Sequence, residues 1–148
     1  MRGGMNMHEI MRQAQQMQKK IGTFVDDVVS SLRKETTEVC TRVIRNIKEG
    51  KVIRSNTLSS LKEFIDRFRE LNFVGDLRIE TELLNLRKEF LSVHTSDTLK
   101  DNADLREELG RRLTMISEAA SDITDINSVT GEYKRQIQWQ DDDVAQAA

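Results

Sequence analysis

A chain of 148 residues is long enough for one domain with a buried core but not for two comfortable ones. An apolar share of 37%, a charged share of 32% and the absence of proline favour slender, well-solvated helices over a sheet that is buried on both faces. The net charge of -2 does not indicate a general nucleic-acid binder, although the charge is uneven: through Arg54 there are 11 Lys and Arg against 6 Asp and Glu.

The first predicted element is one long amphipathic helix over about residues 6–49. Its apolar residues recur at alternating steps of three and four, which is the spacing of a coiled-coil seam: Met7, Ile10, Ala14, Met17, Ile21, Phe24 and Val28. Beyond Val28 the apolar stripe broadens, so more than one element can cover it there. At about 1.5 Å per residue this helix is roughly 60 Å long. The other predicted helices are too short to cover such a seam.

Two glycines bear on whether this helix is continuous and where it ends. Gly22 follows Lys19 and Lys20 and precedes Thr23, so it is compatible with a helix end and a new start, and therefore with a hairpin. The apolar seam nevertheless keeps its phase through Gly22, which favours a continuous helix, since an internal glycine costs only about 1 kcal/mol. Gly50 is the first firm stop.

Three further helices are predicted from apolar periodicity and capping residues, at about 57–71, 77–92 and 102–127. The helices at 57–71 and 77–92 should lie antiparallel, joined by a turn in which Phe73 and Val74 tuck inward as a hydrophobic plug. Residues 93–102 are polar and read as a loop. The fold class is therefore an all-α, elongated helical bundle, with a single domain over residues 1–139 and a disordered acidic tail over residues 140–148.

Residues with catalytic or ligand-binding chemistry are sparse. His8 and His94 have no second His or Cys at metal-ligand spacing, and the neighbouring carboxylates belong to solvated helix faces, so we expect no metal and no cofactor. Cys40 lies on the apolar face and reads as a small hydrophobic residue. The polar residues after Arg2 are unlike a signal peptide, and no stretch approaches the ~20 apolar residues of a membrane span. We expect a non-enzymatic, cytoplasmic protein that neither associates with a membrane nor acts on a small-molecule substrate.

One string resembles a known family. Gly3-Gly4-Met5, followed by the glutamine-rich run from Met11 to Lys20, is similar to the opening helix of the YbaB/EbfC nucleoid-associated proteins, small bacterial dimers that bind DNA. In that family the helix precedes an antiparallel sheet. The resemblance covers about residues 3–21, and the rest of the chain is not recognised. It implies a dimer and a role in DNA binding.

The leading functional hypothesis is a protein–protein interaction or assembly module that self-associates, or binds a helical partner, through its first helix. The predicted interface comprises Met7, Ile10, Met11, Ala14, Met17, Ile21 and Phe24. The alternative is a nucleoid-type DNA-binding protein, whose phosphate contacts are then Arg33, Lys34, Arg42, Arg45 and Lys48, interspersed with Glu35, Glu38 and Glu49.

Overall fold

The computed structural model describes the backbone of residues 6–147 and the side chains of residues 6–137. This part of the chain is all-α and contains no strand, which confirms the predicted fold class. In chain order its elements are α1 (Met7–Lys48), α2 (Ser55–Leu71), α3 (Leu77–Leu86), the π-helical turn η1 (Arg87–Leu91), α4 (Ser96–Asp101), α5 (Ala103–Ala120) and α6 (Ile123–Ala147).

The long helix α1 is continuous through Gly22, so the hairpin alternative is excluded and the predicted bounds of 6–49 are confirmed to within a residue. The Asn6 side chain accepts a hydrogen bond from the Glu9 amide at 2.8 Å and caps the first turn. At the other end Gly50 adopts a φ of 71°, a conformation that favours glycine, and the chain turns there toward α2.

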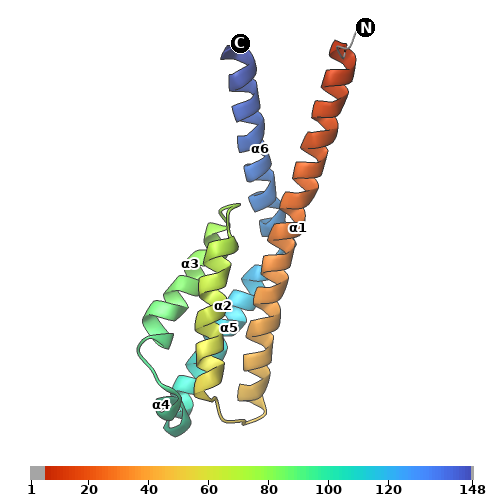
Figure 1. The fold of residues 1–148 in the computed structure, drawn as a ribbon. Coiled ribbons are helices and arrows are strands. Elements are labelled where there is room, and N and C mark those ends of the chain that lie inside the picture. Colours follow the sequence, from red (N-terminus) through yellow and green to blue (C-terminus); the bar gives the residue numbers. More distant parts are fainter. Residues whose placement is uncertain (1–5, 148) are drawn as a thin grey trace.

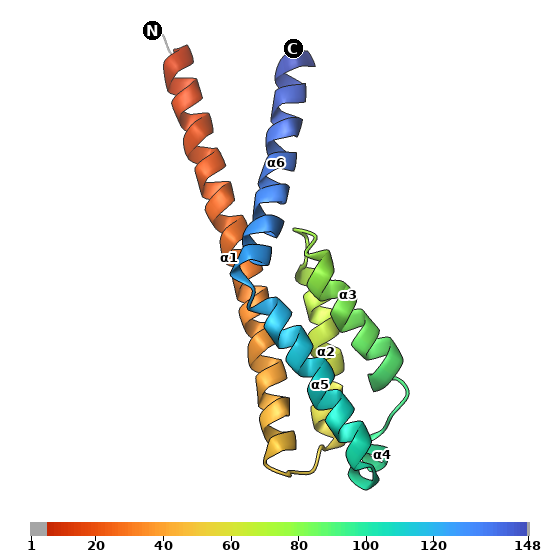
Figure 2. The ribbon, with the colours of Figure 1, turned by 180° about the vertical axis from the view of Figure 1, so that it is seen from behind.

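A helical body packs against the second half of α1 only (Figures 1 and 2). There α1 packs most extensively against α5, and α2 lies beside it, with α3 packed on α2 and α5. The core between these helices includes residues that are almost completely buried on each of them, among them Cys40, Phe68, Ile79, Leu83 and Leu113. Gly110 of α5 lies against Ile47, where an added Cβ would be 3.7 Å from the Ile47 Cδ1 atom, which is an ordinary van der Waals contact.

Two segments differ from the sequence prediction. The helix expected over 102–127 breaks after Ala120, because Ser121 ends α5 and the Asp122 carboxylate accepts a bond from the Asp125 amide at the start of α6. The expected loop at 93–102 contains α4, which Thr95 caps and which buries Leu99 completely. A single buried leucine is too weak a periodic signal to predict a helix.

Two helices extend beyond the body, and α6 is the second of them after α1. The sequence places a disordered tail from residue 140, whereas in the structure α6 continues through these residues to Ala147. Residues 132–147 contain neither glycine nor proline, so nothing in their backbone chemistry interrupts a helix. Beyond the body, α1 and α6 diverge, and their free ends lie at the same end of the molecule (Figure 1).

Candidate interaction surface

The two diverging helices form a fork, defined here as residues 7–24 of α1 (the α1 arm) and residues 131–147 of α6 (the α6 arm). All seven residues of the predicted interface lie on the α1 arm and are exposed. The six larger side chains retain between 38% and 73% of their accessible surface: Met7, Ile10, Met11, Met17, Ile21 and Phe24. No residue from 6 to 24 is buried, and the first buried side chain of α1 is Val25.

The arms meet at the base of the fork through a polar contact and a glycine. Lys134 of α6 donates to the Asp26 carboxylate of α1 at 2.9 Å. The side chain of Lys134 passes over Gly22, where an added Cβ would lie 3.4 Å from the Lys134 Cε atom. Below this point Val25 and Val29 pack with Ile126 and Val129 of α6. Gly22 therefore marks the place where α6 stops covering α1, although the helix itself continues.

A cleft of about 560 Å³ lies between the two arms, and Asp26 and Lys134 themselves form part of its lining. Ile21, Gly22 and Thr23 line it from α1, and Gly131 and Ile137 line it from α6. The side chains of Lys134 and Arg135 lie over the two glycines, since a Cβ added at Gly22 would be 3.4 Å from the Lys134 Cε atom and one added at Gly131 would be 3.3 Å from an Arg135 guanidinium nitrogen. The cleft is thus open, bounded by both arms and partly apolar.

Three aromatic rings form the side of the fork base next to the turn between α2 and α3. The rings of Phe24 and Phe73 are stacked with their centroids 5.9 Å apart, and Tyr133 of α6 meets Phe73 edge to face at 6.3 Å. Phe24 and Phe73 remain 57% and 53% exposed. The prediction that Phe73 tucks inward is therefore wrong. Only Val74 is buried, because adjacent residues of a turn point in different directions.

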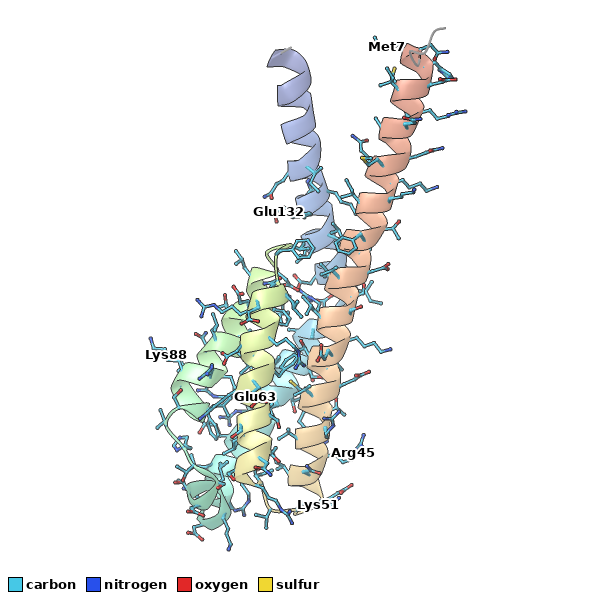
Figure 3. All side chains as sticks on the ribbon, in the orientation of Figure 1. Met7, Arg45, Lys51, Glu63, Lys88 and Glu132 are labelled. Carbon is cyan, nitrogen blue, oxygen red and sulfur yellow. The ribbon has the colours of Figure 1, made fainter. Side chains whose placement is uncertain are left out.

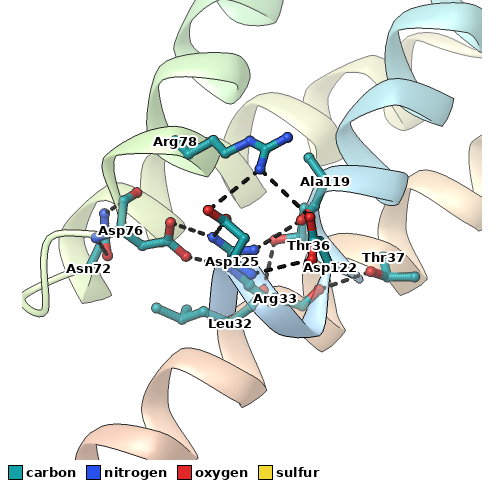
Figure 4. Close-up of polar contacts among 10 residues, drawn as sticks. All are labelled: Leu32, Arg33, Thr36, Thr37, Asn72, Asp76, Arg78, Ala119, Asp122 and Asp125. Carbon is teal, nitrogen blue, oxygen red and sulfur yellow. Dashed lines mark hydrogen bonds and ion pairs between the residues drawn. The ribbon is translucent and has the colours of Figure 1, made fainter. Parts of the chain in front are cut away.

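Arg33 connects the body to the start of α6 (Figure 4). Its guanidinium donates to both carboxylate oxygens of Asp76, at 2.6 and 2.8 Å, to the Asp125 carboxylate at 2.5 Å, and to the Ala119 carbonyl at 2.9 Å. Burial by itself lowers the pKa of Arg33, but its hydrogen bonds and proximity to Asp76 and Asp125 raise that pKa above the ordinary value. Arg78 approaches the other Asp125 oxygen at 3.4 Å from the solvent side.

This arrangement corrects one residue of the alternative DNA-binding set. Arg33 is 1% exposed and its guanidinium is engaged by protein groups, so it cannot contact a phosphate. The other four members are exposed on the second half of α1: Lys34, Arg42, Arg45 and Lys48. Sequence alone does not separate Arg33 from these four, because its partners Asp76 and Asp125 are distant in the chain.

Sequence reasoning missed Phe73, Tyr133 and Lys134 as members of the fork base. The helical spacing of Val129, Tyr133 and Ile137 predicts a further short turn or helix that caps the bundle, but not the contact of Tyr133 with Phe73. For Lys134 there was none, because its position over Gly22 depends on how α6 crosses α1.

Side chains that could hold a metal ion are not grouped in the part of the chain that the structure describes: no three His, Cys, Asp or Glu residues come close enough together. Cys40 is buried, and desolvation raises the pKa of its thiol to about 12. Within the same part of the chain, no helix has the length and apolar character to cross a membrane. No known protein family, curated protein or solved structure matches the chain.

Proposed function

We propose that this protein is a non-enzymatic assembly module that self-associates through the α1 arm. The proposal depends on one observation: an apolar stripe with coiled-coil spacing lies on the α1 arm, and its larger side chains stay 38–73% exposed even though Phe24 stacks on Phe73 and Ile21 borders the cleft. Burying apolar surface contributes roughly 25 cal/mol per Å², so an uncovered stripe of this length favours association with another surface.

The distribution of charge on the α1 arm supports a buried face that is wider than a two-helix seam. In the heptad that places Met7 at position a and Ile10 at position d, the flanking positions of the α1 arm are Met11, Gln13, Gln18 and Lys20, of which only Lys20 is charged. His8, Glu9 and Arg12 occupy outward positions. Two-stranded coiled coils usually carry charges at the flanking positions, whereas uncharged flanks suit a helix that contacts more than one neighbour.

The resemblance of residues 3–21 to the YbaB/EbfC proteins also supports this proposal, because those proteins are dimers. In our proposal the same segment of this chain provides the interface.

A matched pair of variants tests the function. Met17→Glu places a charge on the stripe, and Gln16→Glu places the same charge beside it on the outward side; both positions are exposed in the single chain. We expect light scattering at micromolar concentration to give an oligomer for the unmodified protein and for Gln16→Glu. Met17→Glu should weaken association at least about 10-fold, because a buried unpaired carboxylate is costly. An unmodified protein that stays monomeric at 100 µM would contradict the proposal.

DNA binding remains the second candidate, on a different surface. Lys34, Arg42, Arg45 and Lys48 are exposed and fall within one third of the circumference of α1, although Glu38 lies among them. A mobility-shift titration at two salt concentrations tests this candidate. If it is correct, changing these four residues to Ala should abolish retardation at low salt. Absence of retardation by the unmodified protein at low salt would remove it.

A further inference from the structure

We propose that the fork receives the fork of a second copy of this chain head-on, so that the tip of each α1 arm enters the cleft at the base of the other fork. The inference rests on the proposed self-association and specifies its partner and geometry. Such an arrangement has two-fold symmetry, since the tip of the first copy contacts the base of the second, and the tip of the second contacts the base of the first. It converts two open helix pairs into one four-helix bundle.

One edge of the apolar stripe of the α1 arm borders the space that a second fork would occupy. Ile21 lines the cleft together with α6, and Met7, Ala14 and Met17 lie on the same side of the helix at steps of three and four. Figure 3 shows sulfur-bearing side chains of this arm on the side toward α6, with Met7 at the tip. The stripe is therefore directed at least partly into the fork rather than away from it.

The lengths of the two arms match. From Gly22 to Met7 the α1 arm is about 24 Å long, and from Gly131 to Ala147 the α6 arm is about 25 Å long, at about 1.5 Å per residue. A second fork inserted head-on thus brings its tips to the level of the base of the first. The equality also means that neither arm leaves a long uncovered end.

The area available favours contacts from both arms. Two arms with a combined length of roughly 50 Å and a contact width of roughly 10 Å offer about 500 Å² in projection, and more as accessible surface. A stable protein interface buries about 800 Å² per partner. The α1 seam alone provides about half of the projected area, so a dimer through α1 alone is small and a fork-to-fork dimer approaches the usual size.

The base of each fork offers both charged and apolar groups to the tip of an arm. Ile21 and Ile137 line the cleft of about 560 Å³ together with the charged residues Lys19, Asp26, Lys134 and Arg135. Elsewhere at the fork base, Phe24 and Phe73 present half-exposed rings. Met7 and Met11 at the tip are 73% and 57% exposed. Methionine is flexible and its sulfur makes favourable contacts with aromatic rings, so these tips can fill an irregular cleft of this kind.

Charge favours the same arrangement. The α1 arm is basic, with Arg12, Lys19 and Lys20 against Glu9. The α6 arm is acidic, since its residues include Asp141, Asp142, Asp143 and Glu132 against Lys134 and Arg135. In a bundle of two forks each basic arm has two acidic arms as neighbours, its own and the partner's. Pairing through the α1 arms alone places two basic helices side by side.

Disulfide trapping in the full chain distinguishes the geometries. Met11→Cys marks the tip and Thr23→Cys marks the wall of the cleft, and both positions are exposed in the single chain. The native Cys40 does not interfere, because it is buried and the raised pKa of its thiol keeps it protonated at neutral pH. Ser59→Cys, exposed on α2 in the body, is the control for random collision.

The Met11→Cys protein and the Thr23→Cys protein, one of them carrying a size tag, are mixed and oxidised mildly. We expect the mixed Met11→Cys and Thr23→Cys disulfide to form at least about 10-fold more than either protein forms with Ser59→Cys. If light scattering gives a dimer but only Met11→Cys pairs with itself, or no mixed disulfide forms, the head-on geometry is overturned while self-association stands. A monomer by light scattering overturns the proposed function itself.

Discussion

The two halves of α1 contain the same helical periodicity and have opposite environments. In the second half Val29, Cys40 and Val43 are at most 4% exposed, because α5, α2 and α6 cover them. In the first half Ile10, Met11 and Met17 are 47–65% exposed. The sequence differs between the halves mainly in the width of the apolar stripe, which is narrow before Val28 and broad after it. The broad part of the apolar stripe is thus buried by other helices of the same chain, whereas the narrow part remains largely exposed.

The largest expected effect on the body comes from Arg33. Arg33→Ala removes the partner of the buried Asp76 carboxylate and should lower the free energy of unfolding by about 3–5 kcal/mol, as measured by urea denaturation. Arg78→Ala is the matched control, because Arg78 also approaches Asp125 but is half exposed, and it should cost under about 1 kcal/mol. Equal effects of the two variants would show that the buried pair is not what connects the body to α6.

A pair of alanine variants compares the body and the fork directly. Leu113→Ala, in the core, should lower the free energy of unfolding by about 2–5 kcal/mol, because it leaves a cavity. Met17→Ala, on the α1 arm, should change it by less than about 0.5 kcal/mol when the protein is dilute enough to be monomeric. A loss of more than about 2 kcal/mol for Met17→Ala in the monomer would show that the arm is covered by its own chain.

Alkaline pH tests the burial of Cys40 in the body. The ordinary pKa of the thiol is near 9, and burial raises it to about 12 in the folded chain. Above pH 9 the unfolded chain loses this proton while the folded chain retains it, so the stability that Cys40 contributes falls as pH rises from about 9 to 12. The free energy of unfolding should fall by about 1 kcal/mol more between pH 8 and 10 in the unmodified protein than in Cys40→Ala. Parallel pH curves for the two proteins would contradict the burial.

A similarly small effect is expected at the fork base. Phe73→Ala removes ring contacts with Phe24 and Tyr133 and should cost about 0.5–1.5 kcal/mol in urea denaturation of the monomer. Leu77→Ala is a suitable control, since Leu77 is close in the chain and 66% exposed, and it should have little effect. A loss for Leu77→Ala as large as that for Phe73→Ala would mean that the rings add nothing specific.

Much of the fold could be predicted because local chemistry determines it. The period of α1, its cap at Asn6 and its end at Gly50 are all encoded within a few residues of the position concerned. The breaks that were missed depend on weaker signals. Ser121 and Asp122 end one helix and begin the next although apolar residues continue on both sides, and α4 contributes only Leu99 to the core.

The amino-acid sequence by itself determined that the chain is helical, where the longest helix begins and ends, and which of its faces is apolar. Only the tertiary structure decided which part of that face is covered, which of the basic residues of α1 is buried, and that Phe73 is exposed. The physical reason is distance along the chain: hydrogen bonds and capping within a helix join residues a few positions apart, whereas Arg33 pairs with Asp76 and Asp125, and Lys134 passes over Gly22, only when separate helices pack together.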